Sequence, residues 1–392
     1  MTEWKTYKIG DLCKISSSKR IFANEYKDSG IPFYRGKEII EKQKGNKIST
    51  ELYISQERYD EIRAKHGVPQ KGDMLLTSVG TLGIPYIVQD EVFYFKDGNL
   101  TWFYNFEGID SRYLYYWFLS PIGKMNIDSK AIGSTQKALT IETLSKFEIS
   151  LPGLEEQRRI AGILGAIDDK IENNRRINTN LELQAQALFD EWMQSCQNKI
   201  LIKELADNIL DYTPNTNRKV VLLNSSDVTE GLFTELPLVD NINLKGQFKK
   251  RFKKGDILYS EIRPRNKHYA YCYFNSDKYI ASTRLIVLRG KKEKIISNTL
   301  LYQYIISQNV YEEFTLKTET RSGTFPQGNY QDLSMIEVPF SEDQQKIAQS
   351  LDVIYDEIWS NYKENESLAT LRDTLLPKLM NGELSVGDVS VD

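Results

Sequence analysis

The sequence predicts an α+β protein with two mixed, strand-rich domains, an antiparallel pair of long coiled-coil-like helices and an internal pseudo-twofold repeat. Three observations support this fold class. A helical segment that begins at residue 154 recurs from residue 341, strand-rich runs precede each copy, and both copies repeat apolar residues with coiled-coil spacing. The predicted boundaries are 1–152 for the first domain, 153–197 for a central spacer helix, 198–339 for the second domain, and 340–392 for a C-terminal spacer helix and tail.

The first domain is predicted from aromatic and β-branched runs bounded by Gly, Pro and Asp. These runs are IPFYRG (31–36), DMLLTSVG (73–80), PYIVQ (85–89), VFYF (92–95) and LTWFYN (100–105). Such short runs between turn residues are typical of strands. An apolar helical run, YLYYWFLS, follows at 113–120. The domain is therefore expected to combine strands with helices.

The central helix begins the repeated segment. LEEQRRIAGILGAIDDKIENNRRIN at 154–178 matches SEDQQKIAQSLDVIYDEIWSNYKEN at 341–365, and matching positions such as Gln157 and Gln344 are always 187 residues apart. A single offset held over this length indicates duplication. Each copy extends to about 41 residues, which at 1.5 Å per residue gives a rod of about 60 Å. We expect the two rods to act as spacers.

Both copies place apolar residues and two asparagines at alternating steps of four and three, the period of a coiled-coil seam. A buried asparagine fixes the register, because only a matched partner satisfies its amide. A homodimeric coiled coil, or two unrelated amphipathic helices in a globular core, would show the same period. The duplication favours an internal antiparallel pair. The predicted seam is Ile160, Leu164, Ile167, Ile171, Asn174 and Asn178 against Ile347, Leu351, Ile354, Ile358, Asn361 and Asn365.

The second domain repeats the layout of the first with different loops. Its strand-like runs are VVLLNSSDV (220–228), DILYSEI (256–262), YAYCYF (269–274) and TRLIVLR (283–289). Lys254-Gly255-Asp256 matches Lys71-Gly72-Asp73, and LLYQYIIS (300–307) matches YLYYWFLS. Scaffold positions recur while loops diverge, which is expected of two domains that share a fold and recognise different things.

Composition excludes several classes of protein. No run reaches the roughly 18 apolar residues of a membrane span, and the start MTEWKTYKIGDL is unlike a signal peptide, so we expect a cytoplasmic location and no membrane partner. Three scattered cysteines and two histidines predict no metal site. The net charge is −3, but residues 154–194 and 341–392 together carry −10, which leaves about +7 on the remainder. A polyanion is therefore expected to bind the domains rather than the helices.

Candidate DNA-binding residues follow from this charge and from loop chemistry. Residues 245–270 hold nine Lys and Arg against two acids, with aromatic residues interleaved; Lys and Arg neutralise phosphates, and arginine also binds guanine edges. A charge run is often only a solvated face, and small polar loops often only form turns. The candidates are Lys250, Arg251, Arg263, Arg265, Lys267 and Arg321 in the second domain, and Arg35, Lys37, Ser78, Thr81, Ser134, Gln136 and Lys137 in the first.

Catalytic motifs are missing from the sequence. It has no G-x-G-x-x-G, no G-x-x-x-x-G-K-[ST], no H-E-x-x-H and no Pro-Pro pair of the kind expected in an amino-methyltransferase. We therefore predict a non-catalytic chain that binds no cofactor or metal itself. Two alternatives stay open: a coiled-coil scaffold that binds proteins without DNA specificity, and a nuclease or methyltransferase with a degenerate motif.

Several of these stretches resemble the specificity subunits of type I restriction-modification systems. They are the repeated EEQRRIAGILGAIDDKI and EDQQKIAQSLDVIYDEI, the LELQAQALFDEWM that continues the first helix, GSTQKALTIETLSKFEISLP before it, and LLPKLMNGEL after the second. The resemblance covers nearly the whole chain, and its helix motifs are more specific than its strand-rich domains.

The resemblance implies a function for each part. Two target-recognition domains would each bind one half of a split double-stranded DNA target, and the helices would fix the gap between the halves. It also implies two adenine-N6 methyltransferase (modification) subunits as partners and, in the full complex, two restriction subunits. S-adenosylmethionine, ATP and magnesium are then expected on those partners. The first domain's SVGTLG (78–83) is replaced by SEIRPRN (260–266) in the second, so we expect the two domains to contact DNA differently.

Overall fold

The computed structural model describes residues 4–43, 45, 48, 51–133, 137–234, 236–320 and 326–388. They form two compact units, Met1–Asn173 with Glu364–Asp392, and Asn174–Lys363. Helices α6 (Leu154–Ser195) and α11 (Gln345–Met380) each contribute one half to each unit. The boundary between the two units therefore falls near the middle of each long helix. The two halves of a helix pack on different strand-rich domains.

The first unit is built on two small sheets and a strand pair. The four-stranded antiparallel sheet has the order β2-β8-β5-β6, and the three-stranded sheet has the order β4-β3-β7 with β3 and β7 parallel. Strand β1 pairs with β9 next to the start of α6. The bounds are β1 Lys5–Lys8, β2 Lys14–Ser16, β3 Ile31–Tyr34, β4 Tyr53–Ile54, β5 Met74–Thr77, β6 Pro85–Ile87, β7 Tyr94–Phe95, β8 Leu100–Tyr104 and β9 Glu148–Leu151.

Helices cover these sheets, and their caps follow from the sequence. Asp110 accepts the backbone N–H groups of Arg112 and Tyr113 at the start of α3, and Ser120 caps α4 through Gly123. The apolar face of α3 packs into a core with α6 and the last turns of α11. The bounds are α1 Gly36–Gln43, α2 Gln56–His66, α3 Ser111–Leu119, α4 Pro121–Lys130 and α5 Ile141–Ser145, with the single turns η1 Ile9–Asp11, η2 Ala23–Glu25 and η5 Val386–Asp388.

The second unit has the same plan. Its sheets have the orders β11-β20-β17-β18 and β15-β12-β19-β16, the latter with β12 parallel to β19, and β10 pairs with β21. A short hairpin, β13–β14, is added. The bounds are β10 Asn198–Leu201, β11 Ala206–Asn208, β12 Lys219–Leu223, β13 Val228–Thr229, β14 Leu232–Phe233, β15 Val239–Asp240, β16 Phe248–Lys250, β17 Ile257–Ser260, β18 Tyr269–Tyr271, β19 Tyr279–Ser282, β20 Leu285–Gly290 and β21 Glu337–Phe340.

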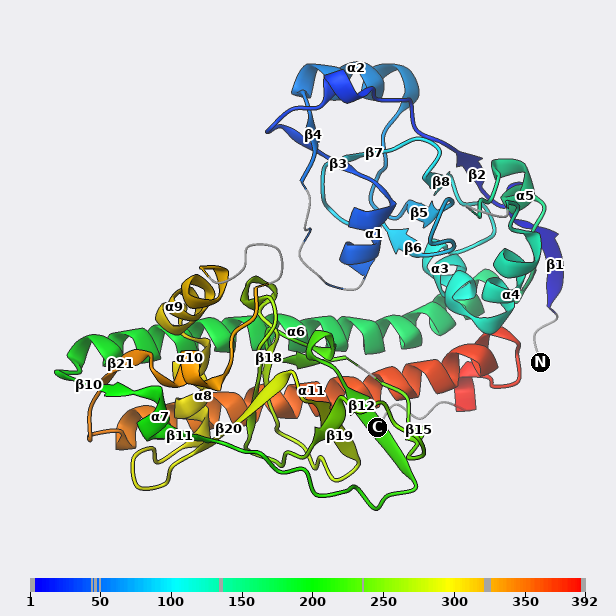
Figure 1. Ribbon diagram of the computed structural model, residues 1–392. Helices are drawn as coiled ribbons and strands as arrows, with labels where there is room; N and C mark the ends of the chain where they lie inside the picture. The colour runs from blue at the N-terminus through cyan, green and yellow to red at the C-terminus, as the bar shows by residue number, and fades with distance from the viewer. Residues whose placement is uncertain are drawn as a thin grey trace. The chain divides into compact units, whose positions relative to one another are not determined.

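The helices of the second unit correspond to those of the first. Helices α8 and α9 follow β20 as α3 and α4 follow β8, and α10 leads into β21 as α5 leads into β9 (Figure 1). The bounds are α7 Ile202–Leu205, α8 Asn298–Ile306, α9 Gln308–Glu319 and α10 Tyr330–Ser334, with the turns η3 Ser225–Asp227 and η4 Pro264–Asn266. The predicted α+β class, with two strand-rich domains and an internal repeat, is confirmed.

The buried glutamines that begin the repeat show how closely the two copies agree. Gln157 donates to the carbonyls of Gly108 and Pro152 and accepts from the N–H of Asp110. Gln344 donates to the carbonyls of Lys294 and Ser341 and accepts from the N–H of Ile296. Each side chain thereby ties the start of its long helix to the loop before the preceding apolar helix, so these amides repeat for a structural reason.

Within each unit, α6 and α11 lie side by side and antiparallel (Figure 1). In the second unit, Asn178 donates to the carbonyl of Ile358 at 3.1 Å, and Asn361 donates to Asn178 Oδ1 at 2.8 Å. In the first, Asn365 donates to the carbonyl of Ile171 at 3.5 Å. Ten of the twelve predicted seam residues are buried, and Ile354 and Asn365 are partly exposed. The asparagines thus bind the opposite helix at equivalent positions.

Among the described residues, no helix combines the length and the apolar character that a membrane span requires.

Candidate nucleic-acid interface

The same pair of loops occurs in both units. In the first, the β5–β6 loop lies along residues 137–139: Gly80 N–H donates to the Lys137 carbonyl at 3.1 Å, and Leu139 N–H donates to the Ser78 carbonyl at 2.9 Å. In the second, the β17–β18 loop lies along residues 326–328, where Arg263 N–H donates to the Pro326 carbonyl at 2.9 Å. The two bridges Val79–Ala138 and Ile262–Gln327 occupy equivalent places.

In the first unit, Thr81 and Lys137 are exposed on this loop pair. Ser78 is not: it is 3% exposed, and its hydroxyl hydrogen-bonds Thr101 and the Leu76 carbonyl. The prediction that Ser78 contacts DNA is therefore wrong for this conformation, because its hydroxyl serves the core. Ser134 and Gln136 lie outside the described residues.

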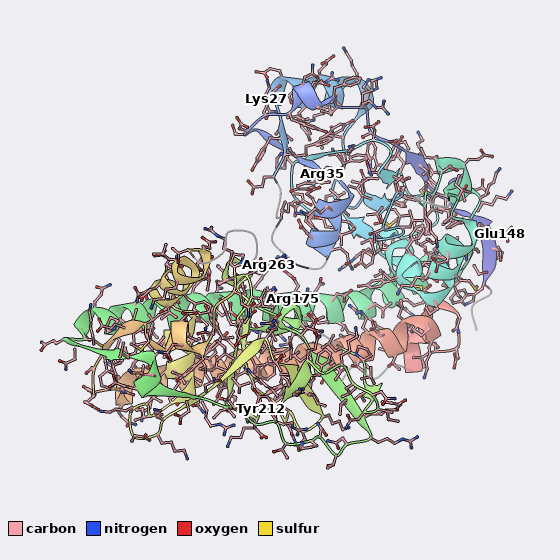
Figure 2. The ribbon with its side chains drawn as sticks, viewed as in Figure 1. Lys27, Arg35, Glu148, Arg175, Tyr212 and Arg263 are labelled. Carbon is pink, nitrogen blue, oxygen red and sulfur yellow. The ribbon has the colours of Figure 1, made fainter. Side chains whose placement is uncertain are left out.

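Arg35 and Lys37 lie where β3 passes into α1 (Figure 2 labels Arg35). Arg35 is half-buried and forms an ion pair with Glu38, a carboxylate whose side chain is 1% exposed. The hydrogen bond from Arg35 to Glu38 raises the pKa of the guanidinium. Arg35 is therefore the ion-pair partner of a buried carboxylate, and part of its side chain is still exposed. Lys37 is exposed, with Glu41 at 3.9 Å.

In the second unit, Arg263, Arg265 and Lys267 all belong to the β17–β18 loop (Figure 2 labels Arg263). The side chain of Arg265 is 70% exposed, and both Nε and Nη2 donate to the Glu319 carboxylate at the end of α9. This pair raises the pKa of the Arg265 guanidinium. Lys267 lies 3.1 Å from Glu230. The loop is thus basic, and the β13–β14 turn and helix α9 supply its counter-charges.

Lys250 and Arg251 are held by the fold. Lys250 is 4% exposed, and its ammonium donates to the Leu285 carbonyl at 2.7 Å. Burial lowers its pKa, against a smaller opposing effect of Glu261. The prediction that Lys250 contacts DNA is wrong for this conformation, since its charge lies inside. Arg251 is partly exposed and donates to the Asp277 carbonyl at 3.0 Å. Arg321 lies outside the described residues.

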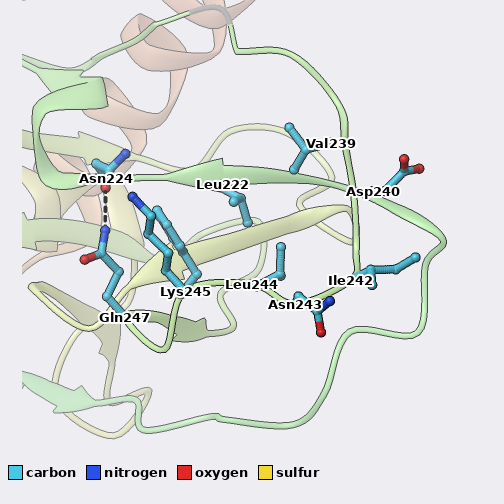
Figure 3. Close-up of a pocket in the computed structure, with 10 residues that line it drawn as sticks. Leu222, Asn224, Val239, Asp240, Ile242, Asn243, Leu244, Lys245 and Gln247 are labelled. Atoms are coloured by element: carbon cyan, nitrogen blue, oxygen red, sulfur yellow. Dashed lines mark hydrogen bonds between the residues drawn. The ribbon is translucent and has the colours of Figure 1, made fainter.

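A shallow pocket of about 450 Å³ lies beside β12, β15 and β16, and the sequence reasoning missed it (Figure 3). Its polar lining is rich in amides, and Gln247 donates to Asn224 Oδ1 at 3.2 Å. Asparagine and glutamine side chains bind adenine edges in the major groove. The amide-rich run DNINLKGQ (240–247) was the available signal. The polar lining residues are Asn224, Asp240, Asn243, Lys245 and Gln247.

The two loop pairs and the pocket expose polar groups of a few kinds. Among the described residues, no cluster of His, Cys, Asp and Glu is arranged to hold a metal ion. The exposed polar groups are loop hydroxyls, amides and cations, which bind phosphates and base edges. The two loop pairs share one backbone plan and differ in side chains, so they can contact different sequences.

A family model described as "Type I restriction modification DNA specificity domain" matches residues 1–183 and 215–369. Among curated proteins, the HindI type I restriction enzyme specificity subunit of Haemophilus influenzae is 36% identical over 163 residues, which are 41% of this chain. That match spans 35% of the relative's own length. The MjaIX specificity subunit of Methanocaldococcus jannaschii is 24% identical over 99% of this chain and 95% of its own length.

A solved structure shares the fold. The crystal structure of the S subunit of a type I restriction-modification system from M. genitalium superposes with a TM-score of 0.61 at 17% identity, covering 96% of each chain. At this identity the likeness concerns the fold.

Proposed function

This chain belongs to the family of type I restriction-modification DNA specificity domains, and on that premise we propose that it is the non-catalytic subunit that selects a two-part DNA target. Each strand-rich domain binds one half-site. One observation carries the proposal: a single loop pair occurs twice on a duplicated scaffold, with glycine and small hydroxyls in one copy and with arginine and lysine in the other.

The duplication explains why the target has two different parts. A symmetric dimer presents two identical surfaces to a palindrome, and an internal repeat presents two similar surfaces that have diverged. The Thr81 loop allows close approach of its backbone to DNA, whereas the Arg263 loop brings cations for phosphates and a fork for guanine edges. The two half-sites are therefore expected to be unrelated in sequence.

The partners proposed for the chain supply the chemistry that its described residues lack. Two modification subunits would carry S-adenosylmethionine and methylate adenine, and two restriction subunits would use ATP and magnesium to cleave unmodified DNA. Family membership supports this assignment. In the chain itself, the long helices have exposed polar faces along with their buried seam, which leaves surface for such subunits.

The helix pair is proposed to set the gap between half-sites. Within each unit its seam is antiparallel and asparagines fix the register, and we propose that the pair acts as a spacer. Inserting one heptad into each helix keeps the seam in phase and adds about 10 Å. At about 3.4 Å per base pair, the recognised gap should lengthen by about three unspecified bases. The same insertion in α6 alone disrupts the seam and should abolish recognition, which makes it the matched control.

The first test is to map N6-methyladenine across the source genome with and without this gene. The expected result is a split motif that disappears on deletion and returns on complementation. If every methylated motif persists in the deletion strain, the chain does not direct methylation there, and the scaffold alternative becomes the better explanation.

A further inference from the structure

Each unit has an equivalent position at the end of one of its parallel strands. Strand β3 runs parallel to β7, and β12 runs parallel to β19. Tyr34 ends β3 and Leu223 ends β12, and both are buried in a core that includes β5 or β17, the strands that follow the repeated Lys-Gly-Asp motif. The next residues, Arg35 and Asn224, therefore occupy equivalent positions in the two units.

An acidic side chain three residues later holds each of these two residues. The N–H of Arg35 donates to Glu38 at 2.8 Å, and Arg35 Nε donates to the same carboxylate at 3.1 Å. Likewise, the N–H of Asn224 donates to Asp227 at 2.6 Å, and Asn224 Nδ2 donates to it at 3.1 Å. The side-chain bonds from Arg35 to Glu38 use Nε and Nη2 and leave Nη1 out. One arrangement thus orients a guanidinium in the first unit and an amide in the second.

In the second unit a further amide joins this arrangement. Gln247 donates to Asn224 Oδ1 at 3.2 Å, and Lys245 lies beside the two amides in the same pocket (Figure 3). The backbone of Gln247 is held as well, because the N–H of Thr283 donates to its carbonyl at 2.8 Å. The bond to Asn224 uses one Nε2 hydrogen of Gln247 and leaves Oε1 and the other Nε2 hydrogen out. An adenine edge requires one acceptor and one donor of this kind.

The segment that carries this further amide takes the place of a helix in the first unit. There, α2 follows β4 and packs Tyr59 and Ile62 on Phe33 of β3, which is 1% exposed. The segment that follows β15, residues 241–254, holds the short strand β16 in place of a helix, with six Lys and Arg and no acid. Leu222 corresponds to Phe33, but it lines the pocket and is partly exposed. The second unit therefore leaves this face of its sheet accessible and borders it with a basic segment.

The equivalent positions carry side chains that suit different bases. Resting on the function proposed above, we propose that Arg35 contacts a guanine edge in one half-site and that Gln247, oriented by Asn224, contacts an adenine edge in the other. The guanidinium donors match the two acceptors of guanine, and an amide matches the donor and the acceptor of adenine. Lys245, which is exposed, binds a neighbouring phosphate, and Leu222 contacts the methyl group of the paired thymine.

Substitutions of the base-reading groups test this proposal. Arg35→Gln keeps a donor for Glu38 but replaces the guanine-binding fork with an amide. The methylome of that strain should lose the guanine requirement at one position of one half-site and keep the other half-site unchanged. Gln247→Ala should remove the requirement at one A·T position of the other half-site, and the purified complex should bind a duplex with the wild-type motif about tenfold more weakly. Lys245→Ala should weaken binding to every sequence and reduce the slope of log affinity against log salt by about one.

Gln56→Ala is the matched control, because it removes an exposed amide, bonded to Asp60 at 3.0 Å, from the helix that takes the place of residues 241–254. It should leave both half-sites unchanged. If either Gln247→Ala or Arg35→Gln retains the full wild-type specificity, or if Arg35→Gln weakens both half-sites equally, the inference is overturned. Gln247 is exposed, so its truncation tests the proposal even if Arg35→Gln unfolds the first domain. If the wild type itself directs no split motif, the proposed function has failed instead, so the two failures are distinguishable.

Discussion

The two units join their domains to the long helices at equivalent positions by different chemistry. In the first, Tyr116 donates to Asp168 at 2.7 Å, and Arg372 donates to the other oxygen of that carboxylate at 2.9 Å. In the second, the matching pair is Gln303 and Tyr355, joined at 2.7 Å. Both residues of the pair differ between the two units, and a hydrogen bond joins the two positions in each unit.

The neighbouring position extends this contrast. Trp359 stacks on Tyr271 at 4.4 Å and lies against Tyr273 and Tyr355, while the matching residue of the first unit is Glu172. At these two positions the first unit therefore has charged and polar side chains, and the second has an aromatic stack. One backbone plan accepts either solution, because the fold specifies where a contact is needed rather than which chemistry supplies it.

The aspartates of the repeated Lys-Gly-Asp motif show the same divergence. Asp73 accepts from the Gln70 N–H and the Trp102 indole, and Asp256 accepts from the Lys253 N–H. Asp256 also receives two bonds from Arg289. The side-chain partner of the aspartate is thus the neutral Trp102 in the first unit and the charged Arg289 in the second.

The largest effect is expected at the aromatic stack. Trp359→Ala removes three ring contacts and leaves a cavity, so the free energy of unfolding should fall by about 3 kcal/mol in urea titrations of the full chain. Glu172→Ala, at the matching position, should cost less than about 1 kcal/mol. Equal losses at the two positions would contradict the division into an aromatic and a polar attachment.

A smaller effect separates the two aspartates. Asp256→Asn leaves Arg289 without its carboxylate and should destabilise the protein by about 2 kcal/mol at pH 7. Asp73→Asn keeps an oxygen that accepts both existing bonds and should be neutral or slightly stabilising. Urea midpoints measured at constant slope test both substitutions. A loss of similar size for Asp73→Asn would show that its charge is needed.

Much of this architecture follows from the sequence, and part of it does not. The 187-residue offset and the seam spacing locate the helices, the repeat and the strand-rich domains, because periodicity and duplication are local signals. The candidate interface is harder to predict from the sequence. Lys250 lies inside a basic run and is buried, and Ser78 turns its hydroxyl to Thr101, since burial is decided by contacts distant in sequence. The ion pair between Arg265 and Glu319, which are 54 residues apart, also could not be predicted from the sequence.

The polar attachment should be more sensitive to salt than the aromatic one. Asp168→Asn weakens the contact to Arg372, whose side chain is 28% exposed, and should cost about 1 kcal/mol at low ionic strength. That difference should shrink in 1 M salt, where charges are screened within about 3 Å. Tyr355→Phe, which removes the matching neutral hydrogen bond, should cost a similar amount at both salt concentrations. A salt-independent loss for Asp168→Asn would mean that the hydrogen bond from Tyr116 dominates.

The smallest expected effect is a pH dependence that comes from Asp73, the aspartate of the first unit. Burial raises the pKa of Asp73 above 3.8, against smaller opposing effects of its bonds to Gln70 and Trp102. The folded state then binds this proton more tightly than the unfolded state, so the contribution of Asp73 to stability is greatest below pH 3.8 and is lost as the pH rises through the folded pKa. Asp73→Asn cannot titrate, and its stability relative to the wild type should therefore increase from about pH 4 upward and then level off. Unfolding free energies of both proteins across this range measure the difference, and a wild type that instead gains stability relative to Asp73→Asn as the pH rises would show that hydrogen bonds outweigh burial at this carboxylate.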